Sequence, residues 1–162
     1  MTAAAYIEAL GLESHPEGGF YRETYRSTGQ VSNEEGKMRN TATCIYYLLC
    51  DEDISHFHKI RSDELWLFHA GSALEILILR ADGELEIHTL GCNPENGEVF
   101  QVIIPAGLWF AARIREGKGF ALASCVVAPG FDFKDFELAD RDELIQQYPS
   151  QRETIHKFCI DK

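Results

Sequence analysis

The chain has 162 residues, which is enough for one domain with a single hydrophobic core. Hydrophobic residues make up 45% and charged residues 25%, the composition of a globular protein rather than a disordered one. With 15 Lys and Arg against 26 Asp and Glu, the formal net charge is −11. This charge disfavours binding to nucleic acid or to an anionic membrane surface. It does not exclude an anionic small molecule, because a pocket can gather a few arginines of its own.

The sequence also indicates a cellular compartment. No apolar run approaches the roughly 20 residues that span a bilayer. Residues 1–12 contain Glu8 and no basic segment, unlike a signal peptide. The five cysteines are odd in number and form no C-x-x-C pair, which favours reduced thiols and predicts a cytoplasmic protein.

The predicted elements place helices at the two ends and strands between them. Thr2 can cap a helix over residues 3–10, which Gly11 ends. Residues 15–19 indicate a turn, and the polar residues 28–39 indicate a flexible loop. Two capping-box patterns, which begin at Asp140 and Ser150, predict two short helices split at Pro149. Short apolar runs separated by turn signals predict strands over residues 41–49, 54–60, 64–69, 73–80, 84–90, 98–104, 108–115, 120–127 and 131–137.

So many short strands predict an all-β sandwich or barrel, in one domain over residues 1–162 with the barrel core at about 40–137. The runs 74–79 and 120–127 are apolar on both faces. One face can line the interior, and the other must be covered by a helix, a second sheet or a partner chain. This pattern is our sequence argument for a homodimer.

Residues 55–66, SHFHKIRSDELW, are the strongest candidate for chemistry. On a regular strand His56 and His58 point to the same face, and a hairpin would place Glu64 opposite His58. Two imidazoles and one carboxylate can bind a divalent metal, or they can work without metal, with a histidine base held by a carboxylate. A slip of one residue would turn Asp63 inward instead of Glu64.

Aromatic residues offer candidate ligand contacts. Trp109 and Phe110 follow a Pro-Ala-Gly turn and either stack on a flat ligand or belong to the core. The same hairpin would place Trp66 opposite His56. Tyr46 and Tyr47 are adjacent on a strand, so one of them faces the interior and is a candidate general acid or hydrogen-bond donor.

Arginines are the candidate groups for a phosphorylated ligand. Arg22, with Arg26 and Arg113, is the best placed in the sequence, although each could equally form a surface salt bridge. The sequence contains no P-loop, no G-x-G-x-x-G after a strand, no G-x-S-x-G and no H-E-x-x-H. Nucleotide-driven phosphoryl transfer and serine hydrolysis are therefore disfavoured.

Four segments together resemble the cupin superfamily. The pattern of His56, His58, Glu64 and Gly71 resembles the first cupin motif, and Pro105-Ala-Gly resembles the start of the second. More specifically, residues 15–23, 55–71, 105–112 and 127–138 are similar to the uncharacterised fifth cupin class, a domain of unknown function related to sugar-nucleotide epimerase-like cupins.

The resemblance implies a double-stranded β-helix, or jelly-roll barrel, with short terminal helices and an internal pocket, usually as a homodimer. It also implies a metal site. Carried over to this chain, three ligands fall on His56, His58 and Glu64, and the fourth falls on Phe110, which cannot ligate. Both a three-ligand site for a divalent metal (Fe, Zn, Mn or Ni) and a pocket without metal stay open.

Three functions follow as hypotheses. The first is an isomerase or epimerase acting on a polar sugar-like or nucleotide-like metabolite, with His58 as base, Asp63 or Glu64 as its orienting carboxylate and Tyr46 or Tyr47 as acid. The second is a binding module that holds a small molecule without turnover, using His56, Trp66, Trp109, Phe110 and Arg22. The third is a metal-dependent oxygenase or isomerase that uses the three predicted ligands.

Overall fold

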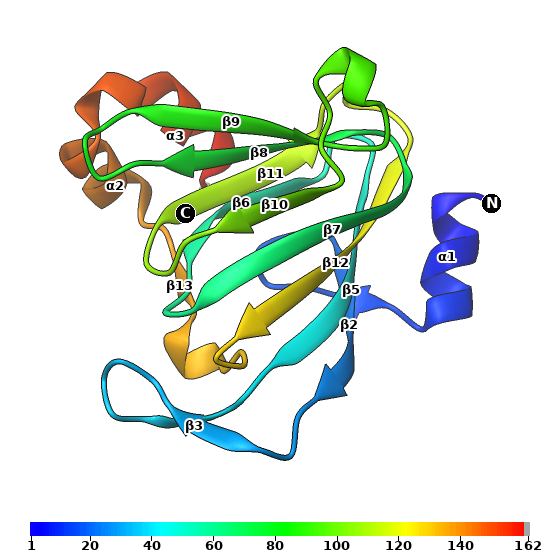
Figure 1. The fold of residues 1–162 in the computed structure, drawn as a ribbon. Coiled ribbons are helices and arrows are strands. Elements are labelled where there is room, and N and C mark those ends of the chain that lie inside the picture. Colours follow the sequence, from blue (N-terminus) through cyan, green and yellow to red (C-terminus); the bar gives the residue numbers. More distant parts are fainter. Residues whose placement is uncertain (161–162) are drawn as a thin grey trace.

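Two β-sheets face each other in the structure, a computed structural model that describes residues 1–160 (Figure 1). The strand order is β1-β2-β5-β12-β7-β10 in the larger sheet and β13-β6-β11-β8-β9 in the smaller one. Neighbouring strands within each sheet run antiparallel. The predicted all-β jelly-roll barrel is therefore confirmed.

The strand bounds follow the apolar runs of the sequence closely. The larger sheet contains β1 (Glu13–Ser14), β2 (Phe20–Arg26), β5 (Thr43–Cys50), β12 (Phe120–Ala128), β7 (Asp63–Gly71) and β10 (Gln101–Ile104). The smaller sheet contains β13 (Glu137–Leu138), β6 (Ile54–Lys59), β11 (Trp109–Ile114), β8 (Leu74–Leu79) and β9 (Leu85–Leu90). The predicted strand over 131–137 is wrong, because this segment forms a short 3-10 helix (Phe133–Asp135) before the two residues of β13.

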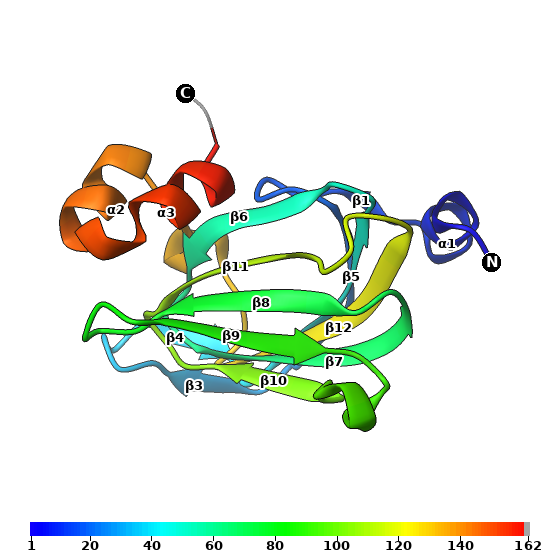
Figure 2. The ribbon, with the colours of Figure 1, turned by 90° about the horizontal axis from the view of Figure 1, so that it is seen from above.

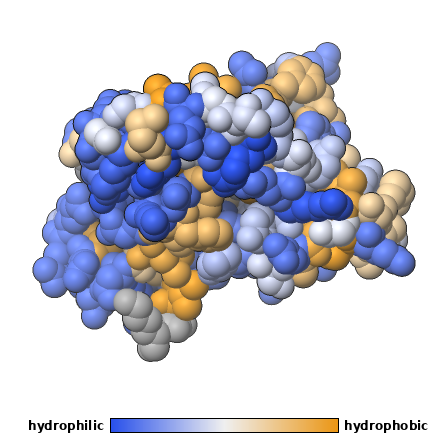
Figure 3. Space-filling view, turned by 90° about the horizontal axis from the view of Figure 1, so that it is seen from below, coloured by the Kyte–Doolittle hydropathy of each residue, from blue (hydrophilic) through white to orange (hydrophobic). Residues whose placement is uncertain are grey.

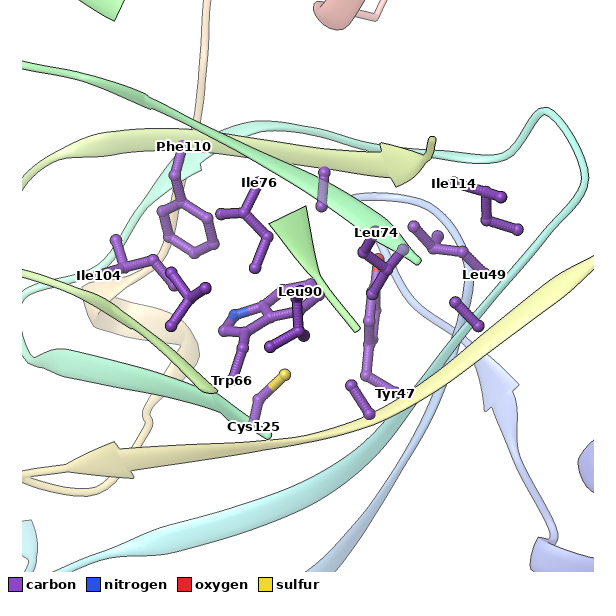
Figure 4. Packing of buried hydrophobic residues seen from close by; sticks show 14 of the residues in the cluster. Tyr47, Leu49, Trp66, Leu74, Ile76, Leu90, Ile104, Phe110, Ile114 and Cys125 are labelled. Carbon is purple, nitrogen blue, oxygen red and sulfur yellow. The ribbon is translucent and has the colours of Figure 1, made fainter. Parts of the chain in front are cut away.

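The main hydrophobic core lies between the two sheets, where side chains from both inner faces meet (Figure 4). Alternation along the strands selects them: Ile76 and Ile78 of β8 point into the barrel, while Leu77 and Leu79 point out of it. Trp66 is the largest of the fully buried side chains. The interior of the barrel is thus mostly filled by apolar side chains.

Helices of the same chain cover the outer apolar faces. Helix α1 (Ala3–Leu10) packs outside β5 and β12 (Figure 2). Helices α2 (Arg141–Gln147) and α3 (Arg152–Phe158) pack outside β6, β8 and β11. The runs that are apolar on both faces therefore do not need a partner chain, and the homodimer stays a prediction.

The helix ends follow the capping signals with one exception. The Thr2 side chain accepts a hydrogen bond from the Ala5 N–H, and Gly11 ends α1 in the left-handed conformation. Asp140 caps α2 in the same way as Thr2 caps α1. The cap predicted at Ser150 is wrong, because Pro149–Gln151 form a 3-10 turn and α3 begins after it without a side-chain cap.

The segment 28–39 is an ordered hairpin rather than the predicted flexible loop. Its strands are β3 (Gln30–Ser32) and β4 (Met38–Asn40), and the Asn33 side chain accepts two main-chain hydrogen bonds inside the turn. Arg39 forms a bidentate ion pair with the buried Asp135, with N–O distances of 2.6 and 2.7 Å. This pair ties the hairpin to the 3-10 helix 133–135.

Two further predictions concern the surroundings of the protein. All five cysteines are unpaired thiols. Among residues 1–160, no helix combines the length and the apolar character needed to cross a membrane. The face of the molecule seen from below is largely hydrophilic, with apolar residues exposed in several separate patches (Figure 3). The cytoplasmic location remains a prediction.

Candidate functional site

A cavity of about 140 Å³ opens at one end of the barrel. Its walls come from β1, β2, β5, β6, β7 and β12, from the turn before β2, and from the segment between β12 and β13. The lining residues are Glu13, His15, Glu17, Tyr21, Glu23, Thr43, Ile45, His58, Ile60, Glu64, Cys125, Val127, Phe131, Phe133 and Phe136.

The turn at residues 15–19 carries Glu17 into this cavity. Gly18 has a φ of +113°, and a Cβ there would lie 2.1 Å from the main-chain oxygen of Ile54. Gly19 also has a positive φ and approaches the main chain of Leu48 closely. Only glycine permits this contact, because any other side chain would collide with the backbone of β5 or β6. Two successive glycines therefore press the turn against the sheets and bury Glu17.

Glu17 is held by two side chains of strand β6. Its carboxylate accepts a bond from Ser55 Oγ at 2.9 Å and lies 3.0 Å from Nε2 of His58. Burial alone would raise the pKa of Glu17. The charge and hydrogen bond of His58, helped by His15 and Ser55, outweigh burial and lower the pKa to about 2. Glu17 is thus a buried carboxylate that stays ionised.

His58 uses both ring nitrogens as donors. Nδ1 lies 2.7 Å from the main-chain oxygen of His56, which can only accept, and Nε2 faces the Glu17 carboxylate. Burial lowers the pKa of His58, but the neighbouring charge and hydrogen bond of Glu17 outweigh it and raise the pKa above its ordinary value. His58 and Glu17 therefore form a buried imidazolium–carboxylate pair in the wall of the cavity.

Glu64 is a second buried carboxyl in the same cavity, in a different electrostatic state. Its Oε1 accepts a hydrogen bond from Nε1 of Trp66 at 2.9 Å. Burial raises its pKa to about 7, and the negative charge of Glu17 adds to this shift, while the charge of His58 opposes it. Glu64 can therefore gain or lose a proton near neutral pH.

The structure decides between the two carboxylates that the sequence left open. Glu64 points into the barrel, whereas Asp63 is exposed and accepts a hydrogen bond from the main-chain N–H of Ala106 at 2.9 Å. The expected hairpin between β6 and β7 does not form, because these strands belong to opposite sheets. Glu64 and His58 thus face the cavity from two different sheets.

His56 does not join His58 in the cavity, contrary to the prediction. Opposite β11, His58 pairs with Phe110 but Ser55 pairs with Ala112, so β6 contains one extra residue, a β-bulge. The bulge places Ser55 and His58 on the inner face. The ring of His56 instead directs Nδ1 to the main-chain oxygen of Glu17, 2.8 Å away.

These contacts do not fit the metal site that the cupin resemblance implies. Of its three predicted ligands, His56 lies outside the cavity lining, and both ring nitrogens of His58 already face protein acceptors. Phe110 is buried with its ring 4.1 Å from that of His58. Across residues 1–160, no three His, Cys, Asp or Glu side chains are grouped in a way that could hold a metal ion.

The other predicted contact residues lie behind or outside the cavity wall. Phe110 and Trp66 belong to the central core (Figure 4), and Trp109 faces outward against the C-terminal helices. Tyr47 is buried and donates a hydrogen bond to the main-chain oxygen of Gly18 at 2.6 Å. Arg22 donates to the main-chain oxygen of Leu10 at the end of α1. Trp66 thus contacts the site through its hydrogen bond to Glu64, and Tyr47 supports the turn at residues 15–19 through its hydrogen bond to Gly18.

Tyr46, the other candidate acid, packs on the outer face of β5 in the cluster beneath α1. Arg113 pairs with Glu75, and Arg26 pairs with Glu23. Both arginines therefore form salt bridges, which was the stated alternative to binding a phosphorylated ligand. None of these three side chains lines the cavity.

Sequence reasoning missed two groups of cavity residues. His15 and Glu17 lie in a segment that we interpreted only as a turn, although its glycine pair beside a glutamate was a usable signal. Phe131, Phe133 and Phe136 lie in the segment that we predicted as a strand. Both segments contribute to the family resemblance, which was the available sign that they belong to a site.

A jelly-roll barrel with an internal pocket is the architecture of cupins, and solved cupin structures share it with this chain. The family model described as "Cupin superfamily (DUF985)" matches residues 4–139. The chain therefore belongs to this cupin family, as the resemblance indicated.

Relatives of known sequence or structure extend this comparison. An uncharacterised protein of Saccharomyces cerevisiae is 36% identical over 148 residues, covering 82% of this chain and 73% of its own. A hypothetical protein from Leishmania major superposes with a TM-score of 0.94 at 35% identity, covering 99% of this chain and 100% of that one. A Shewanella oneidensis protein gives 0.91 at 38% identity, covering 100% and 99%.

Oxalate decarboxylase from Bacillus subtilis superposes with a TM-score of 0.56 at 17% identity, over 90% of this chain and 36% of that one. At this identity the likeness concerns the fold alone.

The close approach at Gly18 generates a stability prediction. We expect Gly18→Ala to lower the free energy of unfolding by more than about 3 kcal/mol, because the new Cβ would overlap a main-chain oxygen. Gly36→Ala is the matched control: its φ is +76° but no atom lies within 4 Å, so about 1 kcal/mol is expected. Urea denaturation measures both variants, and equal losses would contradict the role of the turn.

Glu64 generates a prediction about pH. Its pKa is raised on folding, so protein stability falls as pH rises from about 4.5 through about 7 and then levels off. We expect Glu64→Gln to remove this fall. The free energy of unfolding of the variant should therefore rise by about 2–3 kcal/mol relative to that of wild type between pH 4 and pH 8. Urea denaturation of both proteins at the two pH values measures it. A difference that stays constant with pH would show that Glu64 titrates normally.

Proposed function

We propose that this cupin cavity binds a small polar molecule and catalyses proton transfer on it, as an isomerase or epimerase does. The observation that carries the proposal is the pair of buried carboxyls with opposite pKa shifts, Glu17 lowered to about 2 and Glu64 raised to about 7. Environments that move the pKa values of two neighbouring carboxyl groups apart in this way are typical of acid–base sites.

The three groups take distinct roles in the proposal. Glu64, when ionised, removes a proton from a carbon next to a carbonyl group of the ligand. The electron pair of that C–H bond passes to the carbonyl oxygen, giving an enediol-type intermediate. The positive charge of His58 stabilises the negative charge that develops there, and Glu17 positions His58 and keeps it protonated.

The reaction then closes without any external reagent. For isomerisation, the proton of the neighbouring hydroxyl group passes to the former carbonyl oxygen, and Glu64 then returns its proton to the former carbonyl carbon. For epimerisation, the intermediate turns its opposite face towards Glu64 before the proton returns to the same carbon. This assignment differs from the sequence hypothesis in which His58 is the base, because both nitrogens of His58 already donate hydrogen bonds to the protein.

A second candidate function is binding without turnover. The same double hydrogen bonding of His58 supports it, since an imidazole locked between a carboxylate and a main-chain oxygen can serve structure alone. In that case Glu64 would be a hydrogen-bonding group for the ligand.

Solvent exchange tests the catalytic proposal. The protein is incubated in D2O with a panel of unphosphorylated aldoses, ketoses and amino sugars, and proton NMR follows the C–H group next to each carbonyl. We expect deuterium to replace this proton in at least one compound. The exchange rate should rise with pH through about 7, as Glu64 ionises, and then level off. Glu64→Gln should reduce the rate at least about 100-fold, because it removes the base.

Asp63→Asn is the matched control, because it removes the adjacent carboxylate that lies outside the cavity. If Asp63→Asn abolishes exchange and Glu64→Gln does not, the assignment of the base is wrong. If wild type binds a panel member but exchanges no proton, the binding function replaces the catalytic one.

A further inference from the structure

The outer part of the cavity combines carboxyl groups with aromatic rings and has no Lys or Arg in its lining. Four of the lining residues are glutamates, and His15 and His58 are the only lining residues that could carry a positive charge. The charge of His58 is matched by Glu17. Burial lowers the pKa of His15, although the charge of Glu17 opposes this shift, and Nδ1 of His15 accepts a hydrogen bond from the Glu17 main-chain N–H. His15 therefore supplies little positive charge at neutral pH.

The arginines near the rim are bound to other groups. Arg26 forms a bidentate pair with Glu23 and donates to the main-chain oxygen of Phe131. Arg39 is held by Asp135. Glu13, an exposed residue of β1, forms no ion pair with any residue in the described range 1–160. The mouth of the cavity therefore carries uncompensated negative charge.

Three phenylalanines stand beside this charge with their ring planes nearly perpendicular to one another. The interplanar angles are 81° for Phe131 and Phe133, 72° for Phe133 and Phe136, and 68° for Phe131 and Phe136, with centroids 4.9 to 6.3 Å apart. His15 also stacks on Phe133, with ring centroids 6.1 Å apart and an interplanar angle of 27°. Rings arranged in this way present their faces in several directions at once.

The two arginine contacts hold this aromatic group in place. Arg26 binds the main chain of Phe131, and Asp135, which is tied to Arg39, lies between Phe133 and Phe136 in the chain. The rings are therefore positioned before any ligand arrives, which reduces the entropy lost on binding. Half of the surface of Phe133 is exposed, so its ring is accessible from solvent.

We propose that the ligand of this cavity is a small organic cation, whose ammonium group lies against Phe131, Phe133 and Phe136 with Glu13 as its counter-charge. Aromatic faces attract ammonium groups through the ring quadrupole, and a nearby carboxylate adds to this attraction. Glu13 and Glu23 also help burial to raise the pKa of the Tyr21 hydroxyl in the same wall, as expected where the potential is negative. The phosphorylated ligand considered from the sequence is disfavoured by the same charges.

This inference deepens the proposed function, since it rests on the same cavity being the ligand site, but it requires no turnover. A matched set of three probes tests it by isothermal titration calorimetry: choline, its neutral isostere 3,3-dimethylbutan-1-ol, and the anion 3,3-dimethylbutanoate. Choline should bind at least about fivefold more tightly than the isostere, and the anion should bind most weakly.

Substitutions locate the site. Phe133→Leu and Glu13→Gln should each weaken choline binding about threefold to tenfold and leave binding of the neutral isostere nearly unchanged. Phe100→Leu is the control for ring loss, because Phe100 is similarly exposed but outside the cavity lining. Glu52→Gln controls for the change in net charge, because Glu52 is exposed and also outside the lining.

Several results would overturn the proposal. The ligand class is wrong if choline fails to bind at millimolar concentration, if the isostere or the anion binds as tightly as choline, or if the control variants lose as much affinity as the cavity variants. A preference for choline without any proton exchange would support the ligand class and overturn the catalytic proposal. Proton exchange on an uncharged sugar without a preference for choline would support the catalytic proposal and overturn the ligand class.

Discussion

The buried pair of Glu17 and His58 is the interaction on which the site depends. Each ion alone would be costly to bury, and here each is stabilised by the other and by neutral hydrogen-bond partners. The pair also joins two parts of the chain, because Glu17 comes from the turn before β2, whereas Ser55, His56 and His58 all belong to β6. Ion pairing and hydrogen bonding therefore stabilise this wall of the cavity together with apolar packing.

Placing this pair next to a third ionisable group gives the cavity its chemical character. Burial shifts the pKa values of Glu17 and Glu64 in the same direction, and the difference between them comes from their neighbours. Glu17 has a direct hydrogen bond with the imidazolium, whereas Glu64 receives hydrogen bonds from the neutral Trp66 and Cys125 side chains and is destabilised as an anion by the negative charge of Glu17. Two carboxyls in one cavity thus have different protonation states at neutral pH, which is what acid–base chemistry requires.

The sequence predicted the architecture well, because hydrophobic alternation and turn residues act locally. Strand β8 is an example: its run is apolar on both faces, and in the structure the barrel core covers one face and the C-terminal helices cover the other. The ordered hairpin at 28–39 and the aromatic segment at 131–136 were missed, because both depend on the distant contact between Arg39 and Asp135. The prediction for His56 was wrong because a β-bulge interrupts the alternation of side chains along β6, and no residue type in β6 indicates the bulge.

The sequence by itself determined an acidic chain rich in short strands, the helix caps at Thr2 and Asp140, and the segment that contains His58 and Glu64, and its resemblance to the cupins added the jelly-roll arrangement. Only the tertiary structure decided which carboxylate faces inward, that Glu17 is the partner of His58, and that three phenylalanines line the mouth of the cavity. The physical reason is range. Periodicity and capping act between residues a few positions apart, whereas the charge pairing and burial that define the site act between segments about 40 to 120 positions apart, which meet only when the barrel closes.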